Sequence, residues 1–90
     1  MKIARYVRVT GRVQGVFFRA WAKDEAETIG VTGWVRNDDD GSVEAHIEGN
    51  QPDVEELIDL MREGPPSASV DNLKVEPADP EGLDRFEVRH

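Results

Sequence analysis

The sequence predicts an α+β domain of the ferredoxin-like type, a split βαβ arrangement with two helices on one face of an antiparallel sheet. The first observation behind this prediction is the order of the hydrophobic periodicities: strand, helix, strand, strand, helix, strand, then one more short strand. The second is the length, because 90 residues without a repeat or linker indicate one domain over residues 1–90. Two helices cannot cover both faces of so small a sheet, so both are expected on the same face.

The first strand and the first helix are separated by a change in the spacing of apolar side chains. Residues 3–10 alternate, which predicts a strand whose buried face carries Ile3, Val7 and Val9. From Phe18 onward the spacing is helical, and one helix face is expected to carry four apolar residues: Phe18, Ala22, Ala26 and Ile29. Gly30 follows where a left-handed residue is needed to end the helix.

A β-hairpin is predicted next. Residues 31–37 form its first strand, and Asp38-Asp39-Asp40-Gly41 has the composition of a turn. The second strand alternates, so we expect its apolar residues to be buried: Val43, Ala45 and Ile47. The polar residues between them are expected to point outward: Ser42, Glu44, His46 and Glu48.

The second helix is predicted to begin at the potential cap Asn50, with Pro52 in its first turn, and to end before Gly64-Pro65-Pro66. Its buried stripe comprises Val54, Leu57, Ile58 and Met61. A fourth strand is expected around Val70, Leu73 and Val75, and a short final strand around Phe86 and Val88.

Composition narrows the functional classes. The chain has no cysteine, which excludes disulfides, thiolate metal sites and a cysteine nucleophile. The formal net charge of −8 disfavours binding to nucleic acid or to an anionic membrane. No apolar stretch is long enough to span a membrane or to form a signal peptide, so we expect a cytoplasmic domain.

The charge is unevenly distributed along the chain. Residues 1–23 contain six basic side chains and no acidic one. A cationic segment of this kind suits a small bound anion, although it is equally compatible with pairing to acidic neighbours.

The segment Gly11-Arg12-Val13-Gln14-Gly15-Val16-Phe17-Phe18-Arg19 joins the first strand to the first helix. Its two glycines allow a tight loop whose backbone N–H groups converge, and the N-terminus of the following helix adds a positive dipole end. The Arg19 guanidinium suits a phosphate or a carboxylate. These features indicate an anion site, but the same spacing also fits a plain strand-to-helix connection with a surface arginine.

The same segment, followed by Gly33-Trp34-Val35-Arg36-Asn37, resembles the signature of the acylphosphatase family. The resemblance extends along nearly the whole chain, including the closing Phe86-Glu87-Val88-Arg89. It implies a small ferredoxin-like enzyme that hydrolyses carboxyl-phosphate anhydrides to a carboxylate and inorganic phosphate.

The resemblance also implies roles for individual residues. The phosphoryl group would be cradled by Gln14, Gly15, Val16, Phe17, Phe18 and Arg19. Arg19 would bind its charge and Asn37 would orient the attacking water, with no metal and no cofactor. The implied partner is a small acyl phosphate, and with no surplus apolar stripe the simplest expectation is a monomer.

Three other interpretations remain to be weighed. A non-catalytic anion-binding or regulatory module on the same fold would keep the cradle without turnover. An RNA-binding sheet is hinted at only by Tyr6 and Arg8. His46 and His90 have neither metal-pair nor triad spacing, so a surface role is expected for both.

Two features depart from the family pattern. Three aspartates follow Asn37 directly, where their negative charge could slow the capture of an anionic substrate. The chain ends in His90 where the family often ends in an aromatic residue, which leaves the packing of the last strand open.

Overall fold

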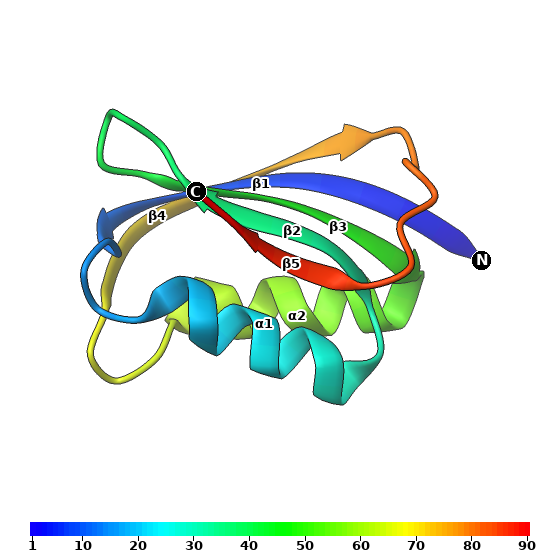
Figure 1. Cartoon of the computed structure of the whole chain (residues 1–90), viewed down its shortest axis with the longest axis horizontal. Helices are drawn as coiled ribbons and strands as arrows, with labels where there is room; N and C mark the ends of the chain where they lie inside the picture. Colours follow the sequence, from blue (N-terminus) through cyan, green and yellow to red (C-terminus); the bar gives the residue numbers. More distant parts are fainter.

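The computed structural model describes residues 1–90 and contains the predicted order of elements (Figure 1). The elements are β1 (Lys2–Arg12), α1 (Phe18–Ile29), β2 (Thr32–Asn37), β3 (Val43–Asn50), α2 (Gln51–Glu63), β4 (Ser69–Ala78) and β5 (Phe86–Arg89). Gly30 ends α1 in the left-handed conformation, with its N–H donating to the carbonyl of Ala26, as predicted. Asn50 precedes α2 but makes no capping hydrogen bond through its side chain.

The sheet has five strands in the order β4-β1-β3-β2-β5, and both helices cover one of its faces (Figure 1). Neighbouring strands are antiparallel except for β5, which runs parallel to β2. The expectation of a wholly antiparallel sheet is therefore wrong at this edge, and the sheet is mixed. The reason is topological: β4 runs opposite to β2, so a strand that reverses after β4 and crosses to the far edge runs parallel to β2.

The hydrophobic core lies between the sheet and the two helices. Alternate residues of the central strands enter it, including Val7 and Val9 from β1 and Val43, Ala45 and Ile47 from β3. The helices contribute the predicted stripes, of which the fully buried members are Phe18, Ala22, Ala26, Val54, Leu57 and Met61. Phe86 of β5 is also buried there, which resolves the question about the packing of the last strand.

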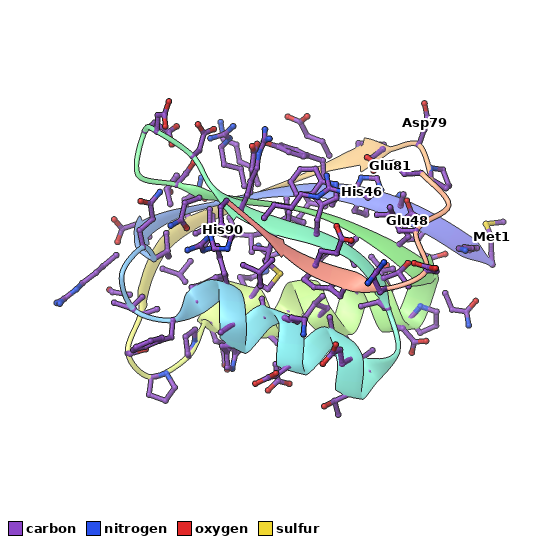
Figure 2. The ribbon with its side chains drawn as sticks, in the orientation of Figure 1. Met1, His46, Glu48, Asp79, Glu81 and His90 are labelled. Atoms are coloured by element: carbon purple, nitrogen blue, oxygen red, sulfur yellow. The ribbon has the colours of Figure 1, made fainter.

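The opposite face of the sheet is also partly covered, and the expected surface role of His46 is wrong. His46 is only 4% exposed, and its ring stacks on Trp34 with 6.1 Å between the centroids. Glu48 beside it is fully buried, and its carboxylate accepts hydrogen bonds from the backbone N–H groups of Glu81, Gly82 and Leu83. The chain between β4 and β5 therefore lies against this end of the sheet (Figure 2).

The Glu48 carboxylate anchors the segment that leads into β5. Burial acts to raise its pKa, but the N–H groups of Glu81 and Leu83 and the ring of His46, whose Nε2 lies 2.6 Å from Oε2, outweigh burial. The pKa of Glu48 therefore lies below its ordinary value. A lowered folded-state pKa contributes stability above the unfolded value of about 4.3, and that contribution is lost as pH falls through the folded value.

Glu48→Gln is accordingly expected to lower the free energy of unfolding at pH 7 by about 1–3 kcal/mol, because an amide NH2 would face backbone donors. The loss of stability on acidification below about pH 4.5 should also become shallower. Urea denaturation at a series of pH values measures both effects. The exposed Glu56→Gln on α2 serves as the matched control, and an unchanged midpoint for Glu48→Gln at pH 7 would contradict this role.

Candidate active site

The loop between β1 and α1, where the sequence predicts an anion cradle, contains two residues with positive φ. Gly15 has φ +73° and Phe17 has φ +64°, the left-handed region that a phenylalanine rarely occupies. No side chain caps α1, so its first N–H groups are left to the solvent or to a ligand. A Cβ at residue 15 would meet no protein atom within 4 Å, so the space above this glycine is open. The uncapped N-terminus of α1 and the backbone at Gly15 are therefore both accessible to a ligand.

A cleft of about 290 Å³ lies at this loop. Its lining residues come from four parts of the chain: Val13, Gly15, Phe17, Phe18, Arg19, Ala20, Asn37 and Val88. The structure therefore brings Arg19 and Asn37 together with Gly15, Phe17 and Phe18, as the sequence predicts. Val13, Ala20 and Val88 were not predicted, and the position of Val88 follows from the pairing of β5 with β2 beside Asn37.

Asn37 is the last residue of β2, and its carboxamide is unusual among the polar groups of the molecule. Its Oδ1 atom is buried and has no hydrogen-bond partner. A buried acceptor without a partner costs about 1–3 kcal/mol. Because Asn37 lines the cleft, an N–H or O–H donor that enters there could supply the missing partner.

Arg19 lies in the first turn of α1, and the end of β5 holds its guanidinium. Its Nη1 donates to the carbonyl of Arg89 at 2.9 Å and lies 3.2 Å from Nδ1 of His90. Because both contacts use Nη1, the Nε and Nη2 groups stay available for an anion in the cleft. His90 is exposed, as expected, and its ring lies beside the Arg19 guanidinium.

Gln14 and Val16, two further residues of the predicted cradle, do not line the cleft. The Nε2 atom of Gln14 donates to the carbonyls of Asp38 and Ser42, at 2.7 and 2.8 Å. Val16 is 7% exposed and joins the core, and its carbonyl accepts a hydrogen bond from the Ser67 hydroxyl at 2.7 Å. The side chains of alternate loop residues thus fix the loop to the rest of the fold.

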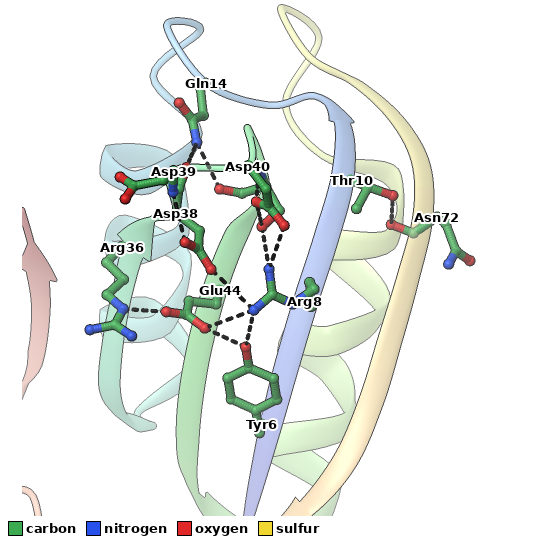
Figure 3. A network of polar contacts seen from close by, with 11 residues as sticks. Tyr6, Arg8, Thr10, Gln14, Arg36, Asp38, Asp39, Asp40, Glu44 and Asn72 are labelled. Atoms are coloured by element: carbon green, nitrogen blue, oxygen red, sulfur yellow. Dashed lines mark hydrogen bonds and ion pairs between the residues drawn. The ribbon is translucent and has the colours of Figure 1, made fainter.

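Two of the three aspartates after Asn37 pair with Arg8 of β1 (Figure 3). The guanidinium lies 3.1 Å from a carboxylate oxygen of Asp38 and 3.1 Å from one of Asp40. The hydroxyl and backbone N–H of Ser42 and the charge of Arg8 hold the pKa of Asp40 below its ordinary value. The predicted repulsion of an anionic substrate is therefore reduced at two of the three aspartates.

Tyr6 and Arg8, the two residues that hinted at an RNA-binding sheet, belong to a network of polar contacts. The Tyr6 hydroxyl donates to Glu44, whose side chain is 5% exposed and also pairs with Arg36 (Figure 3). Arg8 contacts the Tyr6 hydroxyl at 3.0 Å and Glu44 at 3.3 Å. Burial and the neighbouring Glu44 carboxylate raise the pKa of Tyr6. The Tyr6 hydroxyl and the Arg8 guanidinium thus have partners within the protein.

Two further observations concern metals and membranes. No three histidine, aspartate or glutamate side chains gather where they could hold a metal ion. Neither helix is long and apolar enough to cross a membrane.

Comparison with known proteins supplies the family. The family model described as Acylphosphatase matches residues 5–88. An acylphosphatase of Haloarcula marismortui is 52% identical over 84 residues, 93% of this chain and 92% of the relative. An acylphosphatase of Gloeobacter violaceus is 51% identical over 86 residues, 96% of this chain and 92% of the relative. The crystal structure of acylphosphatase from Bacillus subtilis superposes with a TM-score of 0.94 at 34% identity, with 100% of each chain covered. The chain therefore belongs to the acylphosphatase family.

Proposed function

We propose that this acylphosphatase hydrolyses small acyl phosphates by direct attack of a water molecule that Asn37 orients. The phosphoryl group lies in the backbone cradle of residues 14–19, and the Arg19 guanidinium binds its charge. The products are a carboxylate and inorganic phosphate. The enzymatic activity follows from membership of the acylphosphatase family. The mechanism and the role of each residue are what we propose.

The observation that carries the proposal is the unpartnered Oδ1 of Asn37 in the same cleft as Arg19 and the cradle. A carboxamide oxygen accepts a hydrogen bond from a water molecule, while its NH2 group can donate to another oxygen. A water held by Oδ1 would have its lone pair free to attack the phosphorus. The buried acceptor thus gains in the substrate complex the partner that it lacks without substrate.

The chemistry requires no strong general base at this position. An acyl phosphate is an activated anhydride whose carboxylate leaves readily, so positioning and charge stabilisation supply most of the catalysis. Arg19 and the N–H groups of the cradle face the negative charge on the phosphoryl oxygens, which is spread over three atoms in the transition state. Asn37 does not titrate, so its role is to place the water.

We further propose that the domain, residues 1–90, acts as a cytoplasmic monomer on a small substrate. The exposed large apolar side chains are Met1, Phe17 and Val75. Met1 precedes β1, Phe17 precedes α1 and Val75 lies on β4, so the three come from separate parts of the chain. Phe17 lies at the cleft itself, where Val13, Ala20 and Val88 complete an apolar wall beside the phosphate cradle. This wall supports an acyl group with an apolar part.

The test is the hydrolysis of benzoyl phosphate by the purified protein in the presence of a chelator. We expect turnover at an undiminished rate with chelator and competitive inhibition by inorganic phosphate. Loss of turnover with chelator would overturn the metal-independent mechanism. Absence of turnover without chelator, with phosphate still raising the melting temperature, would favour a binding module in place of an enzyme.

A further inference from the structure

The relative position of the cradle and Asn37 is not set by direct strand pairing. The cradle follows β1, and Asn37 ends β2. In the sheet order β4-β1-β3-β2-β5, strand β3 separates these two strands. Catalysis by positioning tolerates little error, since a displacement of about 1 Å can cost about 10²-fold in rate. A direct link between the cradle and the end of β2 would remove that error.

Gln14 makes such a link (Figure 3). Its Nε2 atom donates one hydrogen bond to the carbonyl of Asp38, the residue after Asn37, at 2.7 Å. A second bond runs to the carbonyl of Ser42 at 2.8 Å, on the other side of the β2–β3 turn. The Ser42 carbonyl also accepts the N–H of Asp38 at 2.8 Å, so the carboxamide contacts both ends of this turn where it closes.

The same turn is held from a second direction by Arg8. The guanidinium of Arg8 pairs with the carboxylates of Asp38 and Asp40, and it donates to the Ser42 hydroxyl at 2.6 Å. Arg8 acts from within β1 on the side chains of the turn, whereas Gln14 acts from the cradle on its backbone. Of the two, only Gln14 belongs to the loop that would hold the phosphoryl group.

The chemistry of this link calls for an NH2 group. Two carbonyl acceptors converge on one nitrogen, and a primary amide supplies two hydrogens on that nitrogen without a charge. A glutamate at this position would bring acceptor oxygens against two carbonyls. A methionine would fill a similar volume without any donor. An asparagine would be one methylene too short to keep the same reach.

We propose that Gln14 is a positioning residue whose carboxamide fixes Asn37 over the phosphoryl group in the cradle. This inference rests on the proposed function, in which Asn37 orients the attacking water. It assigns the Gln14 side chain to the placement of Asn37, while the contribution of residue 14 to phosphate binding comes from its backbone.

The first experiment compares Gln14→Met with the unmodified enzyme on benzoyl phosphate. We expect kcat to fall by about 10- to 100-fold, since the water is misplaced. The inhibition constant of inorganic phosphate should change by less than about threefold, since the backbone cradle and Arg19 remain. Gln51→Met is the matched control, because Gln51 is exposed at the start of α2 and its side chain contacts only Glu55. Both of its constants should stay at the unmodified values.

Gln14→Glu is the second variant, and it preserves the shape of the side chain while removing the donors. It should reproduce the loss of kcat, and its added negative charge beside the cradle should weaken phosphate inhibition as well. The comparison of kcat with phosphate affinity therefore uses Gln14→Met, which adds no charge. A kcat within about twofold of the unmodified enzyme in both variants would overturn the inference. So would a loss of phosphate affinity in Gln14→Met as large as its loss of kcat, which would place the Gln14 side chain in phosphate binding.

Two further outcomes separate this inference from the proposed function. If both variants are unfolded at the assay temperature, Gln14 is required for the fold itself and the positioning role is overturned. If the unmodified protein hydrolyses benzoyl phosphate but Asn37→Ala retains full activity, the proposed role of Asn37 fails, and the inference about Gln14 fails with it. Normal turnover that depends on Asn37 but not on Gln14 overturns the inference alone.

Discussion

Arg19→Ala is expected to lower kcat/KM for benzoyl phosphate by about 10²–10³-fold or more, the usual cost of removing a donor that stabilises transition-state charge. The guanidinium lines the cleft, and its Nη1 is already bound to the carbonyl of Arg89. Its remaining N–H groups are therefore oriented before substrate arrives. We expect KM to rise and kcat to fall, because the phosphoryl oxygens carry negative charge in the ground state and in the transition state. Steady-state kinetics with phosphate inhibition separate the two contributions.

The control for this variant is Lys23→Ala, which removes a positive charge from the same helix. Lys23 pairs with Glu27 at 3.4 Å on the exposed side of α1 and does not line the cleft. Its loss should leave kcat/KM within about twofold, because the Lys23 ammonium is exposed, is already paired with Glu27 and does not reach into the cleft. If Lys23→Ala and Arg19→Ala slow the reaction equally, net charge and not the guanidinium of Arg19 governs the rate.

Sequence periodicity predicts the elements and the core of this molecule because each helix and most strands bury one face. The alternation of Val43, Ala45 and Ile47, for example, correctly places these three residues under the helices. The loop between β1 and α1 could also be located from its two glycines and the arginine that follows, but this spacing fits an anion site and a plain strand-to-helix connection alike, so the anion site stays a prediction. The role of Asn37 could be predicted only from the resemblance to a family, because an asparagine before a turn is common and does not by itself indicate a function.

The features that the sequence could not predict depend on segments that are distant along the chain. His46 alternates like a surface residue, yet it is buried against Trp34, at the end of the sheet where the segment after β4 binds Glu48. Neither Trp34 nor this segment is near His46 in sequence, so local pattern contains no information about the burial. Gln14 illustrates the same limit within the site. The family signature predicts only that Gln14 belongs to the cradle. The two carbonyls that its side chain contacts come from the β2–β3 hairpin and are identified only in the folded structure.

The unpartnered oxygen of Asn37 leads to the second large prediction: Asn37→Ala should abolish measurable turnover of benzoyl phosphate while leaving phosphate binding nearly unchanged. The side chain would act on the water and not on the phosphoryl oxygens, so its removal affects a step that inorganic phosphate does not report. Removing a buried acceptor that lacks a partner should also leave stability unchanged or raise it slightly. Kinetics, phosphate inhibition and thermal melting measure the three effects on one sample.

The matched control is Asn72→Ala. Asn72 is exposed on β4, and the hydrogen bond that it accepts from the Thr10 hydroxyl ends on its backbone carbonyl and not on its side chain. It should retain the kcat of the unmodified enzyme. Asn37→Asp sharpens the test, since it keeps the shape and the acceptor but adds a negative charge beside an anionic substrate. We expect it to weaken phosphate binding as well as turnover, whereas Asn37→Ala weakens turnover alone. An alanine variant that loses phosphate affinity together with activity would mean that Asn37 holds the phosphoryl group, and the attacking water would then need another partner in the cleft.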